Sequence, residues 1–423
     1  MALVMLISLL VFMLLSVPIA FSLGLSSIVA ILIEGKLPYE LLIQRMFASI
    51  DSFALLAIPF FVLAGKIMGT GGISRRLVDL STSFIGHISG GMAIVTVVAS
   101  MLFGAISGSS AATVAALGTI LIPAMINKGY SKRFAAGTQA VSGELGVIIP
   151  PSIPMILYGV STGTSVGAMF LAGIIPGILT GLVLMITVYI IAKIKGYSSD
   201  DRAPWKDRWN AFKDATFALL MPIIILGGIY GGIFTPTESA AVAVAYSLIV
   251  GLFIYKEIKV KDLLPMLGES AVLSAIIMVI VSAAGLFGWI LTKGMIPQQA
   301  AAIIADFTTS KILFLLLVNL FLFFVGMFFE TGSAIIILAP ILLPVALTFG
   351  VDPVHFGMIM IVNLAMGMCT PPVGVNLFIS SRIAGISLEE ITMGVLPFLL
   401  VLIINLLILT FFPVISLWLP SLN

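Results

Sequence analysis

Long apolar runs are the feature that most restricts how this sequence can fold. Of its 423 residues, 61% are hydrophobic and only 9% are charged, whereas soluble domains have about 25% charged residues. A helix needs about 20 apolar residues to cross the ~30 Å hydrocarbon core of a bilayer. We therefore predict an all-α protein that crosses a membrane many times. Runs of suitable length lie at 2–33, 53–69, 167–192, 215–233, 237–255, 271–292 and 388–412.

Two further apolar runs, at 134–165 and 355–385, are interrupted midway by a pair of prolines. Proline lacks the backbone donor and clashes with the preceding turn, so each run is predicted to be a broken helix. A shift of 221 positions aligns Pro150 and Pro151 with Pro371 and Pro372, and it aligns five other Gly or Pro positions. We infer an internal duplication, with halves at 1–196 and 234–423.

The segment between the halves, 197–233, is predicted to be a cytoplasmic loop followed by a single linker helix. The first half has an even number of predicted crossings, so this extra helix starts the second half on the opposite side of the membrane. The halves are then inverted repeats. Inverted repeats with discontinuous helices are typical of secondary transporters, whose binding sites lie at the repeat interface.

Two stretches, 90–127 and 311–348, each contain two apolar limbs around a small polar tip. The tips read "SGSS" at 107–110 and "ETGS" at 330–333. The limbs are short for crossing a bilayer, so we predict re-entrant hairpins, with two extra crossings each as the alternative. The first 33 residues lack a charged leader and an obvious cleavage site, and we interpret them as a retained helix.

The basic residues predict the orientation. With nine crossings and the amino terminus inside, 16 of the 20 Lys and Arg residues fall on the cytoplasmic face. The positive-inside rule then places the amino terminus in the cytoplasm and the carboxyl terminus outside. Because the basic residues lie between apolar runs, the net charge of +2 gives no indication of nucleic-acid binding. One cysteine, Cys369, excludes a disulfide framework.

The tips and the breaks predict two cation sites. Broken helices leave backbone carbonyls free for a hard cation such as Na⁺, and the tips add hydroxyl groups. We pair the first tip with the break at 146–151 and the second tip with the break at 367–372. The alternative is that these Ser and Thr side chains only bond to neighbouring helices. The candidate cation ligands are Ser107, Gly108, Ser109, Ser110, Gly146, Ile149, Pro150, Thr331, Gly332, Ser333, Gly367, Cys369 and Thr370.

Polar groups near the same breaks are candidates for binding substrate. Asn376 either faces the substrate or caps the second half-helix, and for Arg382 we favour snorkelling at a helix end over a substrate role. Glu144 and Glu330 are either coupling groups or residues that reach water in a cavity. The candidate substrate residues are Ser109, Ser110, Pro151, Ser152, Thr331, Pro372, Asn376 and Arg382.

Several motifs in series resemble the large membrane subunit of tripartite ATP-independent periplasmic (TRAP) transporters, over nearly the whole chain. They are "FGAISGSSAATVAALGTILIPAM", "GVIIPPSIPMILYG", "TPTESAAVAVAYSLIVG" and "TPPVGVNLF". The resemblance implies Na⁺-driven uptake of an organic acid, such as a C4-dicarboxylate or sialic acid, across a bacterial inner membrane. It also implies a periplasmic substrate-binding protein and a separate small four-helix membrane subunit as partners.

The same resemblance implies the fold of divalent-anion/sodium symporters, which work as elevators. Those symporters have Ser-Asn-Thr at both tips, and this chain departs from them with Ser-Ser-Ala at 109–111 and Glu-Thr-Gly at 330–332. Segments 34–52 and 256–270 are predicted to be interfacial arms between a fixed scaffold and a moving core. No residue in the sequence chooses among the carboxylates.

Other functions remain as alternatives. A sodium/anion symporter that needs no binding protein, or an ion channel, would use similar backbone sites. An enzyme is disfavoured because the histidines, His87 and His355, fall at segment ends, away from "AISGSS". An ATP-driven pump is disfavoured because the sequence lacks a GxxxxGK[ST] loop.

Overall fold

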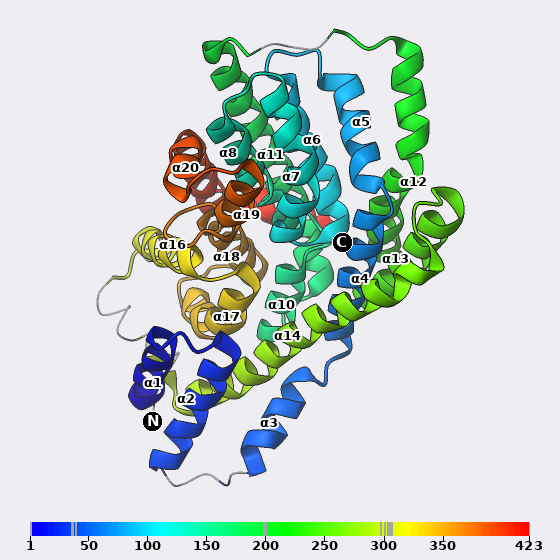
Figure 1. Ribbon diagram of the computed structural model, residues 1–423. Coiled ribbons are helices and arrows are strands. Elements are labelled where there is room, and N and C mark those ends of the chain that lie inside the picture. Colours follow the sequence, from blue (N-terminus) through cyan, green and yellow to red (C-terminus); the bar gives the residue numbers. More distant parts are fainter. Residues whose placement is uncertain are drawn as a thin grey trace.

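The computed structural model describes residues 2–34, 38, 40–197, 201–296, 298–299, 302 and 308–422. Within these ranges every regular element is helical (Figure 1). Nine of the described helices are long and apolar enough to cross a membrane, or ten with one bent pair counted as a single span. The chain is therefore a multi-pass helical membrane protein, as its apolar runs predict.

The amino-terminal run forms two helices, α1 (Ala2–Leu14) and α2 (Ile19–Glu34), which fold back on each other. The expected single helix over 2–33 is therefore wrong. Ser16 has a φ of 60°, and Pro18 cannot continue the preceding helix.

The next three helices, α3 to α5, lead from the amino-terminal pair to the first hairpin (Figure 1). α3 (Glu40–Ile50) lies within the predicted arm 34–52 and packs on α14. α4 (Ala57–Thr70) follows a 3₁₀ turn and matches the predicted crossing at 53–69. α5 (Ile73–Ile85) was not predicted, because its polar and charged residues interrupt the apolar pattern.

Two helical limbs lie in the stretch predicted to be the first hairpin, and a bent pair of helices lies at the first predicted break. The two limbs of the hairpin, α6 and α7, pack along each other. The broken helix bends by 43° at its break, and the long helix α11 follows it. The bounds are α6 Gly91–Ser107, α7 Ser110–Asn127, α8 Lys132–Ser142, α9 Leu145–Ile148, α10 Ile153–Thr162 and α11 Val166–Lys195.

The middle of the chain differs from two expectations. The linker helix α12 (Trp205–Tyr230) begins ten residues before the apolar run, and α13 (Pro236–Ile249) continues into a π turn. α14 (Val260–Lys293) is one unbroken helix, so a separate arm over 256–270 is wrong. The helix continues through Pro265 and Gly268, and no further Gly or Pro lies between Gly268 and Gly285 to end it.

The second half repeats the first. The shift of 221 residues that aligns the prolines also aligns both ends of α7 with those of α17, and α19 has the same length as α10 but starts one position later than this shift predicts. Both Pro-Pro bonds are cis. The bounds are α16 Lys311–Phe328, α17 Thr331–Thr348, α18 Pro353–Gly367, α19 Val375–Ala384, α20 Leu388–Phe411 and α21 Val414–Leu417.

The second hairpin is more open than the first. α16 packs mainly on α18, and α17 packs mainly on α10, α18 and α14. The pairing of α17 with α10 has a counterpart, because α7 packs on α19 in the same way. Each hairpin therefore contacts the broken helix of the other repeat, which holds the two repeats together.

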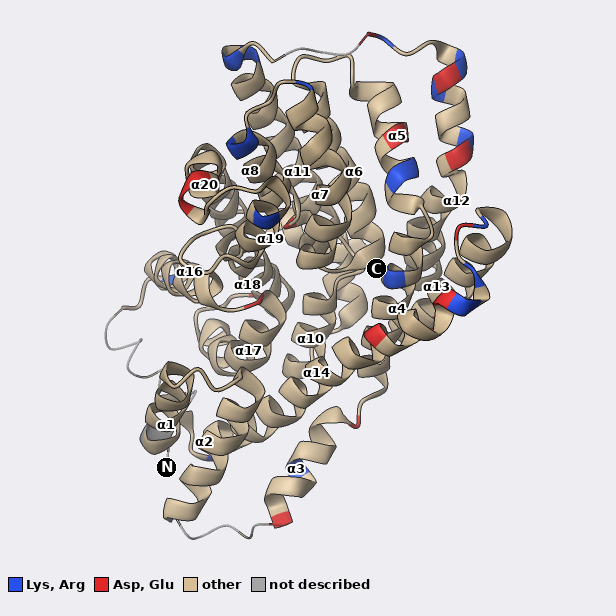
Figure 2. Ribbon diagram, viewed as in Figure 1, with Lys and Arg blue, Asp and Glu red and all other residues tan. Residues whose placement is uncertain are grey.

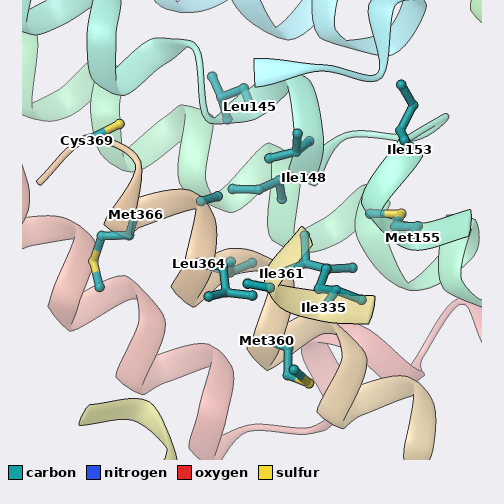
Figure 3. Close-up of a cluster of buried hydrophobic side chains, with 14 of the residues drawn as sticks. Leu145, Ile148, Ile153, Met155, Ile335, Met360, Ile361, Leu364, Met366 and Cys369 are labelled. Atoms are coloured by element: carbon teal, nitrogen blue, oxygen red, sulfur yellow. The ribbon is translucent and has the colours of Figure 1, made fainter. Parts of the chain in front are cut away.

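Apolar side chains fill the space between the broken helices. Leu145 and Ile148 of α9 lie near Leu364 and Ile361 of α18 in this cluster (Figure 3). Charged residues are instead concentrated around the ends of α8, α11 and α12, on α5 and at the α13–α14 connection (Figure 2). Most charged residues thus lie away from the centre of the molecule, where the buried polar side chains are mainly uncharged, such as Asn363 and Asn405.

Candidate functional site

The first hairpin tip lies directly on the first helix break. The Gly108 carbonyl accepts a hydrogen bond of 3.2 Å from the Ile153 amide at the start of α10, and Gly108 has a φ of +62°. A Cβ on Gly104 would lie 3.0 Å from the Cα of Gly146. Glycine is needed at both places, since the two backbones touch.

Three oxygens gather at this contact. The Ser107 and Thr113 hydroxyls are 3.0 Å apart, and Thr113 Oγ1 donates to the Ser109 carbonyl at 2.8 Å. A Cβ on Gly146 would collide with Thr113 Oγ1 and would lie 2.6 Å from the Ser109 carbonyl. Hydroxyl and carbonyl oxygens of this kind are ligands for a hard cation. Sequence reasoning missed Thr113, although its position one turn after Ser109 places its hydroxyl over the tip.

The second tip meets the second break in a related way. Gly326 of α16 and Gly367 of α18 are in backbone contact, and the Gly374 amide donates to the Met327 carbonyl at 3.3 Å. Thr331 is fully buried, and its hydroxyl donates to the Met368 sulfur at 3.1 Å. Thr331 of the second tip thus contacts the 367–372 break through Met368.

The N-cap of α17 is Glu330, whose carboxylate accepts the Ser333 amide at 3.1 Å. Glu330 is exposed to a cavity, unlike Glu144, which is 1% exposed. Both Glu144 carboxylate oxygens lack a hydrogen-bond partner among the described residues. In those residues we find no group of three or more His, Cys, Asp or Glu side chains that could hold a metal ion.

The second break is linked to the first repeat. Asn376 Nδ2 donates to Ser110 Oγ at 2.7 Å and to the Ala140 carbonyl at 3.1 Å, and Cys369 Sγ donates to the same carbonyl at 3.2 Å. The Thr370 hydroxyl donates to the Met366 carbonyl at 3.0 Å. Asn376 therefore joins the second broken helix to the first tip.

A cavity of about 800 Å³ lies between the tips and two helices, α4 and α14. Both tips line it, with Ser107, Gly108 and Ser109 from the first repeat and Glu330, Gly332 and Ser333 from the second. The structure thus brings candidate residues of both repeats to one space. Most of the remaining wall is apolar, as is usual in a small-molecule site.

Other candidate residues do not line this cavity. Asn376 is buried in the contact with Ser110, and Pro372 is exposed on a different surface. Arg382 is exposed near the end of α19, where its guanidinium lies 4.3 Å from the centre of the Phe378 ring. Ser152 caps α10 and donates to the Val147 carbonyl at 2.7 Å. The candidates Pro150 and Pro151 are buried at the first break, and Ile149 ends α9 beside Gly177.

One solved structure resembles this architecture in its fold, at low sequence identity. The chain superimposes on the YdaH transporter of Alcanivorax borkumensis with a TM-score of 0.61, covering 90% of this chain and 87% of that one at 15% identity. That protein's structure is described as having an unusual topology. Agreement at this level supports the fold and says nothing further about activity.

Sequence comparison is more specific. The chain is 47% identical over 408 residues to the isethionate TRAP transporter permease protein DctMQ of Oleidesulfovibrio alaskensis, covering 96% of this chain and 64% of that relative. It is 44% identical over 400 residues to the C4-dicarboxylate TRAP transporter large permease protein DctM of Pseudomonas aeruginosa, covering 95% and 94%. It is 38% identical to the sialic acid TRAP transporter large permease protein SiaM of Vibrio cholerae, covering 96% of this chain and 95% of SiaM.

 The family profile described as "Tripartite ATP-independent periplasmic transporter, DctM component" matches residues 6–415. The chain therefore belongs to the DctM component family of the TRAP transporters.

Proposed function

We propose that this protein is the large membrane subunit of a Na⁺-coupled importer of an organic acid, located in a bacterial inner membrane. The observation that carries the proposal is the shared cavity: both hairpin tips line it, and each tip lies on a helix break of its own repeat. Discontinuous helices at a repeat interface are where secondary transporters bind substrate and coupling ions.

The first proposed Na⁺ site lies between the first tip and the first break. Its oxygen ligands come from Ser107, from Thr113 and from the Ser109 carbonyl, beside Gly146. The second proposed site lies at the equivalent place in the second repeat, around Thr331 and Thr370. Two sites imply that at least two Na⁺ ions accompany each substrate.

The substrate class follows from what the relatives are named for. Isethionate, C4-dicarboxylates and sialic acid are all organic anions with a sulfonate or a carboxylate group. A cavity of about 800 Å³ is large enough for any of them. The partners in this proposal are a small membrane subunit and a periplasmic binding protein that delivers the acid.

The proposed mechanism is an elevator, in which the hairpins and broken helices move against α4 and α14. Gly69 of α4 faces the core, since a Cβ there would lie 3.7 Å from the Phe103 ring of α6. A short reversible bifunctional reagent that joins Gly69→Cys to Phe103→Cys should stop uptake, and its removal should restore uptake. Each single variant with the same reagent is the control. Undiminished uptake after complete cross-linking would exclude an elevator.

The function itself is tested by uptake into proteoliposomes that contain both membrane subunits and the binding protein. Isethionate, succinate and N-acetylneuraminate are the probes. We expect uptake of at least one acid to rise sigmoidally with external Na⁺ and to stop without the binding protein. Uptake without the binding protein would favour a simple sodium/anion symporter. Conductance without coupled flux would favour a channel.

A further inference from the structure

The cavity contains an ion pair that the proposed sites do not use. Lys66 of α4 and Glu269 of α14 are paired within its wall, and their side chains are 40% and 63% exposed. Among the described residues that line the cavity, Lys66 is the sole basic side chain. The acidic residues of this lining are Glu269 and Glu330.

Lys66 is held close to the first tip by its neighbour in the chain. A Cβ on Gly65 would lie 3.4 Å from the Cα of Ser107, so α4 and the tip approach each other at this point. The next residue, Lys66, lines the same cavity as Ser107 and Ser109. An acid bound beside the tip hydroxyls is therefore near the Lys66 ammonium group.

An organic anion loses hydration when it moves into a largely apolar cavity, and neutral hydroxyl groups do not compensate its charge. A nearby positive charge does compensate it: the proposed Na⁺ ions supply part of this charge, and a cation in the cavity wall adds to it. Lys66 already has a counter-ion, and the exposure of Glu269 leaves that carboxylate free to turn to water when another anion replaces it.

We propose that Lys66 binds the acidic group of the transported anion and that Glu269 is the counter-ion that this group displaces. This inference rests on the proposed function and names the residue that recognises the substrate class. The ion pair then serves two states: it neutralises Lys66 in the empty cavity, and it opens when a carboxylate or sulfonate arrives.

A purely structural role for the pair is the competing explanation, because the pair also connects α4 to α14. The chain offers a matched control in Arg76 and Glu257, which form an ion pair of 2.6 Å between α5 and the segment before α14. Neither of these residues lines the cavity. Variants of both pairs lose one salt bridge between distant parts of the chain, and only variants of the first pair change the charge of the cavity.

The first test measures the electrostatic potential of the cavity without any substrate. Ala112 of α7 lines the cavity and is exposed, so Ala112→Cys is a reporter, while Cys369 is fully buried. The probes are a neutral thiol reagent and the anionic 2-sulfonatoethyl methanethiosulfonate. Lys66→Gln should slow the anionic reagent by about tenfold relative to the neutral one, and Glu269→Gln should accelerate it.

Arg76→Gln should leave both modification rates unchanged. Equal effects of Lys66→Gln on the two reagents would show that Lys66 does not attract anions, and this result would overturn the proposal. Thermal unfolding of each variant, compared with Arg76→Gln, separates loss of the helix connection from loss of the charge.

The second test is uptake of whichever of isethionate, succinate or N-acetylneuraminate the unmodified protein imports. Lys66→Gln should raise the half-saturating concentration at least about tenfold, whereas Lys66→Arg should retain uptake because the charge is kept. The exchange Lys66→Glu with Glu269→Lys should restore part of the loss. Unchanged half-saturation in Lys66→Gln would overturn the proposal. If the unmodified protein imports none of the three acids, the proposed function fails, and the reagent test still decides whether Lys66 is an anion site.

Discussion

Asn376 and Ser110 lie 266 residues apart in the sequence, and the Asn376 side-chain amide donates a 2.7 Å hydrogen bond to the Ser110 hydroxyl. Asn376 is 0% exposed and Ser110 is 1% exposed. The bond connects the second broken helix to the first hairpin tip. A change in one repeat therefore has a direct physical route to the proposed ion site of the other.

The first prediction concerns this bond. Asn376→Ala removes the donor to Ser110 and to the Ala140 carbonyl, and we expect a loss of about 1–3 kcal/mol in the free energy of unfolding. Ser110→Ala should cost less in the Asn376→Ala background than alone, with a coupling of about 1 kcal/mol. The free energies of unfolding of the purified protein, the two single variants and the double variant give this coupling energy.

A second buried bond between the repeats provides the control. Asn405 donates to the Thr180 hydroxyl at 2.9 Å, away from both tips. Asn405→Ala should reduce stability by a similar amount without changing the Na⁺ dependence of uptake, whereas Asn376→Ala should change both. Additive effects of Asn376→Ala and Ser110→Ala would contradict an energetic link between the repeats.

Much of this architecture follows from the sequence because the signals are local. The paired prolines predict both breaks, and the polar tips predict both hairpins. Each of these motifs interrupts an apolar helix at a definite residue. The reversal at Ser16 was missed because its positive φ has no signal in an apolar run, and Pro18 alone does not distinguish a kink from a reversal. The continuity of α14 was missed because the charges at its start resemble a separate amphipathic arm.

The site is less predictable than the fold, because contacts between the repeats have no local signal. The position of Asn376 after the second break makes it a candidate site residue. Nothing in the neighbouring sequence indicates that Ser110 is its hydrogen-bond partner. The sequence alone assigns Lys66 to the cytoplasmic face together with the basic residues of the loops. It is, however, the single charged residue of the apolar run at 53–69. Its place beside the first tip depends on how α4 packs on α6.

The second prediction concerns backbone contact at the second break. A Cβ on Gly367 would collide with the backbone of Gly326, so Gly367→Ala must push α16 and α18 apart. We expect a loss of about 1–3 kcal/mol in the free energy of unfolding, as for other overpacked positions. The thermal midpoint of the purified protein measures the effect.

Gly227 of α12 is the matched control, because no atom lies within 4 Å of a Cβ built there. Gly227→Ala should be neutral or should stabilise the helix by up to about 1 kcal/mol. If both substitutions have the same effect, the contact between Gly326 and Gly367 is looser than the structure indicates.

The third prediction concerns the hydroxyl groups at the proposed ion sites. Thr113→Val and Thr370→Val remove an oxygen and keep the shape of the side chain. The loss of one buried polar partner is worth about 1–3 kcal/mol, which corresponds to a decrease of about 5–150-fold in apparent Na⁺ affinity. Uptake into proteoliposomes as a function of external Na⁺ measures this change.

Thr119→Val is the control in the same helix as Thr113, because the Thr119 hydroxyl is exposed and donates to the Ala116 carbonyl at 3.1 Å. It should leave the Na⁺ dependence unchanged. Wild-type Na⁺ dependence in both Thr113→Val and Thr370→Val would show that these hydroxyls serve only packing, and the assignment of both ion sites would then fail.

The last prediction concerns the opposite orientation of the repeats. Asn127 and Thr348 are the final residues of α7 and α17, equivalent positions under the shift of 221, and both are exposed. Inversion requires that they face opposite sides of the membrane, and the positive-inside rule assigns Asn127, beside Lys128, to the cytoplasm. A membrane-impermeant thiol reagent should therefore modify Thr348→Cys in intact spheroplasts and Asn127→Cys only after permeabilisation. The parent protein reports the background, which should be low because Cys369 is buried. Modification of both variants from the same side would mean that the repeats are parallel, and two opposed hairpins could not then provide alternating access.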